Sequence, residues 1–224
     1  MIKANCEFCD REQIKDRIIY ENKNFYVIAS LGQISDGGHT LIIPKQHVPC
    51  LGAITDYLEL DDLENLVNIT MNVVHTEFCT KRNGSSHYIE IFPLVVFEHG
   101  IVGQTIQHAH LHIVPCIDFD DLTVRIAREF PNKIETLPMA CFYGLSIRYE
   151  KNPNPYLFWK YGYWPLYLER PRVCWNPPAP SQYFRKVIAE ALGRPERADW
   201  QNMDPVLDKK LREETIRKLK PCFK

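Results

Sequence analysis

The chain has 224 residues, of which 45% are hydrophobic and 25% charged, and this composition excludes a largely disordered protein. Its 27 basic and 28 acidic residues almost cancel, so no overall field attracts nucleic acid, although binding of nucleic acid through a local patch is not excluded. The start of the sequence lacks the apolar stretch of a secretory signal, and no window of about 18 apolar residues occurs. We therefore expect a cytoplasmic protein with no membrane association and with reduced thiols.

The first half of the chain predicts strands around one long helix. Residues 17–30 favour a β-hairpin, because two β-prone runs flank the turn-forming ENKN segment, and residues 37–47 follow as a third strand that ends at Pro44. Apolar residues recur at helical spacing from Asp56 to about Cys79. Residues 85–100 and 104–117 predict two more strands. The expected fold is an α+β antiparallel sheet of about five strands with packed helices.

The composition changes after about residue 135. All four tryptophans and ten of the sixteen prolines lie beyond residue 150. Residues 156–172 predict a hairpin, and residues 181–193 predict a helix with Ser181 as N-cap and Gly193 at its end. Asp204 and Pro205 open a last, highly charged helix. We expect residues 1–134 to form a catalytic domain and residues 135–224 to form an aromatic and proline-rich α+β extension of unknown role.

Three histidines alternate with apolar residues in the segment QHAHLHIVP, residues 107–115. In a strand, His108, His110 and His112 share one face, at a spacing of about 7 Å per pair, while the residues between them face the core. Three imidazoles in register repel one another when charged and are costly to bury without partners, so a functional site is favoured. Both a metal site and imidazole catalysis fit this pattern. The preceding VGQT, residues 102–105, offers hydrogen-bond donors suited to phosphate oxygens.

A Cys-x-x-Cys pair, Cys6 and Cys9, lies near the N-terminus, and this spacing suits a tetrahedral zinc site. Two thiolates leave two coordination positions for histidines. The alternative is two ordinary thiols near the end of the chain. His39, His75 and His87 carry weaker claims: His39 is expected to be a packing or hydrogen-bonding residue, His75 a residue on a helix face and His87 a strand residue.

The segment HAHLHIV resembles the signature of the histidine triad (HIT) superfamily of nucleotide hydrolases and transferases, in which three histidines alternate with apolar residues. GHTLIIPKQH and CEFC resemble the glycine-histidine strand and the N-terminal cysteine pair of the zinc-containing branch of that superfamily, and FEHG before HAHLH resembles a variant subgroup. These features span residues 6–115 in the expected order. No comparable match covers residues 135–224.

The resemblance implies roles for residues of this chain. His110 would be the nucleophile that attacks an α-phosphorus, and His112, Gln104 and Thr105 would hold the phosphate oxygens. Gly103, Glu98, His99 and Lys45 are the further candidates for substrate binding. A structural zinc ion would be held by Cys6, Cys9, His47 and His108, with His99 as the competing fourth ligand.

Two positions depart from the pattern of the superfamily. Leu31 stands where members often carry an aspartate for the ribose hydroxyls, and Phe97 stands at the position of the usual phosphate-site asparagine. Glu98 is then either an acid or base beside the phosphate or an ordinary turn residue, and Lys45 either a phosphate contact or a solvated lysine.

The expected activity is hydrolysis of a nucleotide or nucleotide conjugate at its α-phosphorus, with release of a nucleoside monophosphate. A third histidine stands where the transferase branch carries glutamine, which favours water as the acceptor. The alternatives are a nucleotidyltransferase with a phosphate or sugar-phosphate acceptor, and a nucleotide- or RNA-binding adaptor with little turnover. By resemblance we also expect a homodimer that forms through the long helix and a sheet edge.

Overall fold

The computed structural model describes residues 6–82, 89–116, 122–131, 134–138, 140–163 and 167–223. The strands are β1 (Ile18–Glu21), β2 (Phe25–Ala29), β3 (Thr40–Pro44), β4 (Thr80–Arg82), β5 (Ile89–Ile91), β6 (Leu94–Gly100), β7 (Leu111–Pro115), β8 (Ile134–Thr136), β9 (Tyr156–Tyr163), β10 (Tyr167–Leu168) and β11 (Arg172–Trp175). The helices are α1 (Arg11–Ile14), α2 (Tyr57–Phe78), α3 (Leu122–Glu129), α4 (Cys141–Lys151), α5 (Tyr183–Ala191) and α6 (Pro205–Leu219). Short 3₁₀ turns are η1 (Glu7–Cys9), η2 (Lys15–Arg17), η3 (Leu51–Ala53), η4 (Pro195–Arg197) and η5 (Lys220–Cys222).

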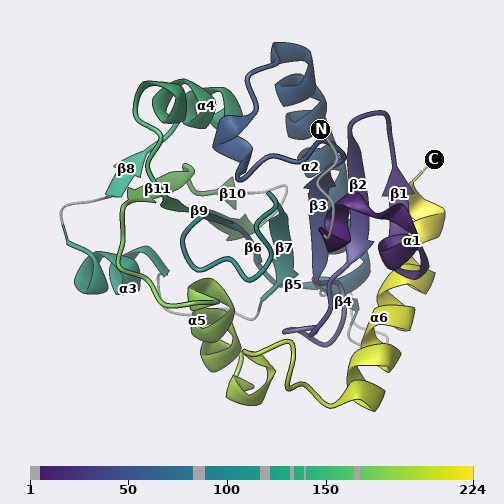
Figure 1. Cartoon of the computed structure of the whole chain (residues 1–224). Helices are drawn as coiled ribbons and strands as arrows, with labels where there is room; N and C mark the ends of the chain where they lie inside the picture. Colours follow the sequence, from purple (N-terminus) through teal and green to yellow (C-terminus); the bar gives the residue numbers. More distant parts are fainter. Residues whose placement is uncertain are drawn as a thin grey trace.

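One antiparallel sheet runs through the molecule in the order β1-β2-β3-β7-β6-β9-β11-β8, with β10 paired to β9 (Figure 1). The α+β class and the antiparallel sheet are confirmed, but the expected count of about five strands is wrong. β9, β11 and β8 come from beyond residue 134 and continue the same sheet, because β6 pairs with β9 along its whole length, from Leu94 opposite Gly162 to Gly100 opposite Tyr156. The boundary at residue 134 stays a prediction about folding units.

Two apolar layers cover the two faces of the sheet. On one face, α2 packs its buried residues, among them Leu63, Val67 and Met71, against Leu111 and Ile113. On the other face, the N-terminal segment covers β1–β3, and α5 packs against β6 and β9 through Phe184. The alternation of side chains along each strand separates these layers. The middle of this second face, between the two covers, is where the histidines lie.

The long helix and the C-terminal helices begin where the sequence predicts, except for the N-cap of α5. α2 begins after Asp56, as expected. The structure adds that the carboxylate of Asp56 caps the helix by accepting from the N–H groups of Leu58 and Glu59. Asp204 caps α6 in the same way through Leu207 N–H. Ser181 is not the N-cap of α5: that place is taken by Gln182, in a left-handed conformation and with no side-chain cap. Part of the strand expected at residues 85–100 lies outside the described residues.

The FEHG segment at the end of β6 joins the two halves of the chain. Glu98 is fully buried and accepts hydrogen bonds from the Leu51 N–H (2.8 Å) and from the Tyr156 hydroxyl on β9 (2.6 Å). A Cβ at Gly100 would lie 2.3 Å from the ring of Tyr156, so only glycine allows that ring to pack there. Glu98 is thus a buried link between η3 and β9. Burial raises its pKa to about 8, although both hydrogen bonds oppose that shift.

Glu98→Gln should change the pH dependence of stability. Because the pKa is about 8 in the folded protein and 4.5 for an ordinary glutamate, this carboxyl contributes stability that is complete below pH 4.5 and is lost as the pH rises through 8. The free energy of unfolding of the wild type should therefore fall by up to about 5 kcal/mol relative to that of Glu98→Gln across this window. Urea unfolding at a series of pH values measures the difference.

The exposed Glu190, which pairs with Arg125 at the surface, provides the control. Glu190→Gln should keep the wild-type profile. Parallel profiles for the wild type and Glu98→Gln would contradict a raised pKa.

Candidate functional site

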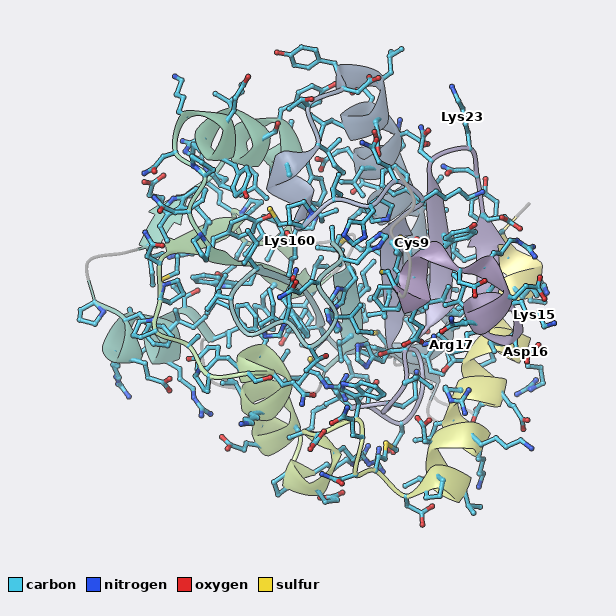
Figure 2. The ribbon with its side chains drawn as sticks, in the orientation of Figure 1. Cys9, Lys15, Asp16, Arg17, Lys23 and Lys160 are labelled. Atoms are coloured by element: carbon cyan, nitrogen blue, oxygen red, sulfur yellow. The ribbon has the colours of Figure 1, made fainter. Side chains whose placement is uncertain are left out.

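A cavity that is open to solvent lies on the face of the sheet opposite α2. The cavity is lined by Glu7, Phe8, Arg17, Ser30, Leu31, Leu41, His99, Gly103, Gln104, Thr105, Ile106, His110, His112, Gln182, Arg185 and Trp200. Figure 2 marks Cys9 and Arg17, which belong to the N-terminal segment beside this cavity. Four stretches of the chain therefore build the walls: the N-terminal segment, residues 30–41, residues 99–112 and residues 182–200.

His110 lines the cavity and is held by one backbone contact. Its Nδ1 lies 2.7 Å from the carbonyl oxygen of His108. A carbonyl oxygen only accepts, so Nδ1 carries the proton and Nε2 bears a free lone pair. Burial lowers the pKa of His110 to about 4, while the hydrogen bond to His108 opposes this shift and the charge of Arg185 adds to it. The imidazole is therefore neutral near pH 7, with an available nitrogen.

His112 lies on β7 between β3 and β6. Its ring stacks on that of Phe97, with centroids 4.3 Å apart, and its Nδ1 lies 2.9 Å from Nε2 of His39. His39 is thus a hydrogen-bonding residue, as expected. Nε2 of His112 is buried and has no hydrogen-bond partner among the described residues. An unpaired buried nitrogen at the wall of a cavity is a ready contact for a polar ligand atom.

The expected spacing of the three histidines is wrong in detail. β7 begins only at Leu111, so His108 and His110 precede the strand, and the rings of His110 and His112 are 5.0 Å apart rather than about 7 Å. Pro44, at the end of β3, has no N–H to donate to a neighbouring strand. Its carbonyl oxygen accepts a hydrogen bond from Nε2 of His108. The residues between the histidines face the core as expected, since Ala109, Leu111 and Ile113 all pack in the layer of α2.

The loop before the triad brings the predicted phosphate-binding residues to the cavity. Gly103, Gln104 and Thr105 all line it. Gly103 has a φ of 76°, and a Cβ there would meet the carbonyl of Pro180 at 2.9 Å. The Gln104 amide donates to the carbonyl of Pro49 (3.0 Å), and Thr105 Oγ1 accepts from the indole N–H of Trp200 (3.3 Å). The loop is therefore fixed against both the core and the C-terminal half.

The other predicted binding residues separate into two groups. His99 lines the cavity, and its Nε2 accepts from the backbone N–H of Phe184 at the start of α5 (3.1 Å). Burial lowers the pKa of His99 to about 3, so it stays a neutral acceptor. Glu98 and Lys45 are not among the residues that line the cavity. Lys45 pairs with Glu21 (3.1 Å) at the surface instead.

Four side chains converge behind the cavity. Donor atoms of Cys6, Cys9, His47 and His108 all lie within 4.8 Å of one another. Nδ1 of His47 is 3.2 Å from Nδ1 of His108, and the sulfur–nitrogen distances are 3.4 Å for Cys6 to His108 and for Cys9 to His47. His99 does not belong to this cluster. These four residues form a candidate metal site.

The donor set fits a tetrahedral ion. Zinc–nitrogen bonds of about 2.0–2.1 Å and zinc–sulfur bonds of about 2.3 Å place neighbouring ligand atoms about 3.3 Å (N to N) and about 3.6 Å (N to S) apart. The observed distances between ligand atoms, 3.2 Å from nitrogen to nitrogen and 3.4 Å from nitrogen to sulfur, are close to these values. Nε2 of His108 donates to the Pro44 carbonyl (2.8 Å), which leaves the Nδ1 lone pair directed at the cluster.

The C-terminal half contributes three cavity residues that the sequence analysis did not single out: Gln182, Arg185 and Trp200. Arg185 lies on the buried face of α5, within YFRKVIAEA, and is 4% exposed. It stands next to Lys186 in a mostly apolar helix, and this context does not indicate which of the two cations is buried. Nothing in the spacing of these residues relates them to a triad about 75 positions away. The pairing of β6 with β9, together with contacts such as that of Phe184 with His99, brings them together.

Among the described residues, no helix is long and apolar enough to cross a membrane.

Comparison with known proteins relates the N-terminal half to one family. The HIT domain profile matches residues 11–118. An uncharacterized HIT-like protein of Mycoplasma genitalium is 32% identical over 114 residues, which are 50% of this chain and 73% of that protein. A second one, of Methanocaldococcus jannaschii, is 26% identical over 123 residues, or 54% of this chain and 85% of that protein.

Among solved structures, a HIT family protein from Bacillus anthracis is similar, with 26% identity and a TM-score of 0.40 over 55% of this chain and 86% of that chain. Because the Mycoplasma relative is matched over most of its length at 32% identity, and the domain profile includes all three triad histidines, the chain belongs to the HIT family.

Proposed function

We propose that the protein hydrolyses a nucleotide or nucleotide conjugate at its α-phosphorus, through a nucleotidyl intermediate on His110. The observation that carries this proposal is the hydrogen bond from His110 Nδ1 to the His108 carbonyl, which leaves Nε2 as an unprotonated nitrogen at the wall of the cavity. Membership of the HIT family, whose proteins bind nucleotides, supports the choice of substrate class.

In the first step, Nε2 of His110 attacks the α-phosphorus and forms a P–N bond while the bond from phosphorus to the leaving group breaks. The ring gains positive charge, which the Nδ1 hydrogen bond to the His108 carbonyl stabilises. His112 would donate from Nε2 to a non-bridging oxygen, with His39 donating to its other ring nitrogen. Gln104 and Thr105 lie where the same phosphate would be held.

In the second step, water attacks the phosphorus, the P–N bond breaks, and the nucleoside monophosphate leaves. The electron pair of the broken bond returns to His110 Nε2, and the proton lost by water leaves with the product or to solvent. Each phosphate-oxygen donor is expected to contribute on the order of a hundredfold in rate. His99 acts through its contact with Phe184 and positions α5 at the cavity.

The metal cluster is proposed to hold a structural zinc ion. Cys6, Cys9, His47 and His108 would fill all four positions of a tetrahedral site, so the ion would brace the N-terminal segment against the triad. Glu7 and Phe8 lie between the two cysteines and line the cavity, and the Phe8 ring is 5.4 Å from that of His110. Fixing the cysteines therefore fixes one wall of the cavity.

Two alternatives differ in the fate of the nucleotidyl group. A transferase would pass it to a phosphate or sugar phosphate, and an adaptor would bind nucleotide or RNA without forming the intermediate. The homodimer stays a prediction as well. The edge of β6 is occupied by β9 of the same chain, so a second copy would have to use another surface, such as the exposed Tyr57, Leu58 and Ile69 of α2.

Mass spectrometry of protein quenched in alkali during turnover tests the intermediate, because a P–N bond hydrolyses in acid. With adenosine 5′-phosphoramidate or a diadenosine polyphosphate as substrate, the wild type should carry one adenylyl group on His110. His110→Asn should lose this adduct and at least about a thousandfold of the activity, since the nucleophile itself is removed.

His75→Asn provides a matched control, because His75 is a buried histidine of α2 that does not line the cavity. This variant should keep both adduct and activity. Nucleotide binding without any adduct or turnover would favour the adaptor, and transfer of label to added phosphate would favour the transferase.

Metal analysis tests the zinc proposal. The purified protein should contain about one zinc per chain, and Cys9→Ser should lose it and melt at a lower temperature, because metal binding energy is folding energy at such a site. Cys222→Ser is the control, since Cys222 is exposed and outside the cluster. A wild type purified without zinc, whose melting temperature does not rise when zinc is added, would overturn the proposal.

A further inference from the structure

Arg185 of α5 is a buried cation at the wall of the cavity. Burial lowers its pKa to about 10, so the guanidinium remains charged near pH 7. No carboxylate of the described residues lies within ion-pair distance of it. A buried charge without a counter-ion is costly, and this one lies among histidines that are themselves neutral.

Backbone carbonyls hold the guanidinium in place. Nε donates to the carbonyl of Ala198 (3.1 Å), and Nη2 donates to those of Gly32 (2.7 Å) and Arg197 (3.3 Å). Nη1 has no hydrogen-bond partner among the residues that the structure describes. A Cβ at Gly32 would lie 2.7 Å from Nη2, so a residue without a side chain is what allows this approach. The side chain is therefore fixed, with two N–H groups still to satisfy.

The electrostatic surroundings favour an anion at this place. The charge of Arg185 contributes to the lowered pKa of His99, His110 and His112, and its field therefore reaches all three rings. One turn before it, the amide oxygen of Gln182 is buried and has no partner among the described residues, and Gln182 also lines the cavity. Among the described residues, Nη1 of Arg185 and Oε1 of Gln182, the N-cap of α5, therefore both lack a partner, and both residues line the cavity. Of the two, only the guanidinium attracts an anion.

We propose that Arg185 binds the phosphate of the substrate, so that the C-terminal half of the chain supplies the positive charge of the anion site. This inference rests on the proposed function, because it names the group that recognises the anionic part of that substrate. The guanidinium would donate from Nη1 to a phosphate oxygen while the carbonyls of residues 32, 197 and 198 keep it in place. The triad itself then contributes no net charge to binding.

Binding measurements without turnover test the proposal. Calorimetric titration of the full chain with AMP, inorganic phosphate and adenosine separates the phosphate from the nucleoside. Arg185→Gln should weaken the binding of AMP and inorganic phosphate about 10- to 100-fold, the usual effect of losing a hydrogen bond from a charged donor, and leave adenosine unchanged. Arg185→Lys keeps the charge and should restore part of the affinity for AMP with the same selectivity.

Lys160→Gln is the matched control. Lys160 is also a buried cation of the C-terminal half, on β9 near the ring of Phe142, and it does not line the cavity. Its loss should not change the ratio of AMP to adenosine affinity. Thermal melts show whether each variant is folded, and Arg185→Lys decides the question if Arg185→Gln is not.

Three results would overturn the proposal: equal weakening of AMP and adenosine, no change in AMP binding, or a wild type that binds no AMP. The result does not depend on the adduct on His110. Binding of AMP that requires Arg185 without any adduct would reject the hydrolase and keep the anion site. An adduct on His110, together with AMP binding that does not depend on Arg185, would support the hydrolase and reject the anion site.

Discussion

The antiparallel pairing of β6 with β9 is the constraint on which the rest of the structure depends. β6 also pairs with β7, which carries His112, so the triad strand and the C-terminal half share one strand as their common neighbour. The side chains at the end of β6 contact β7 on one side and β9 and α5 on the other. Phe97 stacks on His112 and lies against Phe184, Glu98 binds Tyr156, and His99 accepts from the start of α5. The FEHG segment is thus a structural joint.

The electrostatics of the cavity follow from this arrangement. Buried imidazoles lose their charge because water is excluded, while the buried guanidinium of Arg185 beside them stays charged because its intrinsic pKa is high. The N-terminal wall adds the pair formed by Arg17 and Glu7, whose charges compensate each other. The cavity therefore combines neutral nucleophilic nitrogens with a guanidinium that has no ion pair among the described residues, while Asp199 and Asp208 act on its charge only from beyond ion-pair distance. This combination suits a phosphate monoester or diester better than a neutral ligand.

The part of the fold that could be predicted from the sequence is the part set by local chemistry. The hairpin at β1 and β2, the helix after Asp56 and the last helix after Asp204 each have a turn or a cap in the sequence that determines where they begin. The cluster of Cys6, Cys9, His47 and His108 was predicted by resemblance, and these side chains do converge. Leu31, at the position of the ribose aspartate, also lines the cavity.

The remainder depends on long-range pairing that no local pattern encodes. The strands beyond residue 134 carry ordinary β-sequences, which do not specify whether they pair with one another or extend an existing sheet. Arg185 could not be recognised as a cavity residue for the same reason. Glu98 was expected either beside the phosphate or in a turn; it lies in β6 and does not line the cavity, because a carboxyl group can also be buried against a tyrosine hydroxyl and a backbone amide.

One cavity wall comes from residues 182–200, close to the end of the chain, and the opposite wall includes Glu7 and Phe8, close to its beginning. A chain cut before α5 would keep every histidine of the triad but would lose Gln182, Arg185 and Trp200 from the cavity. Its histidines would then lack the wall that residues 182–200 provide.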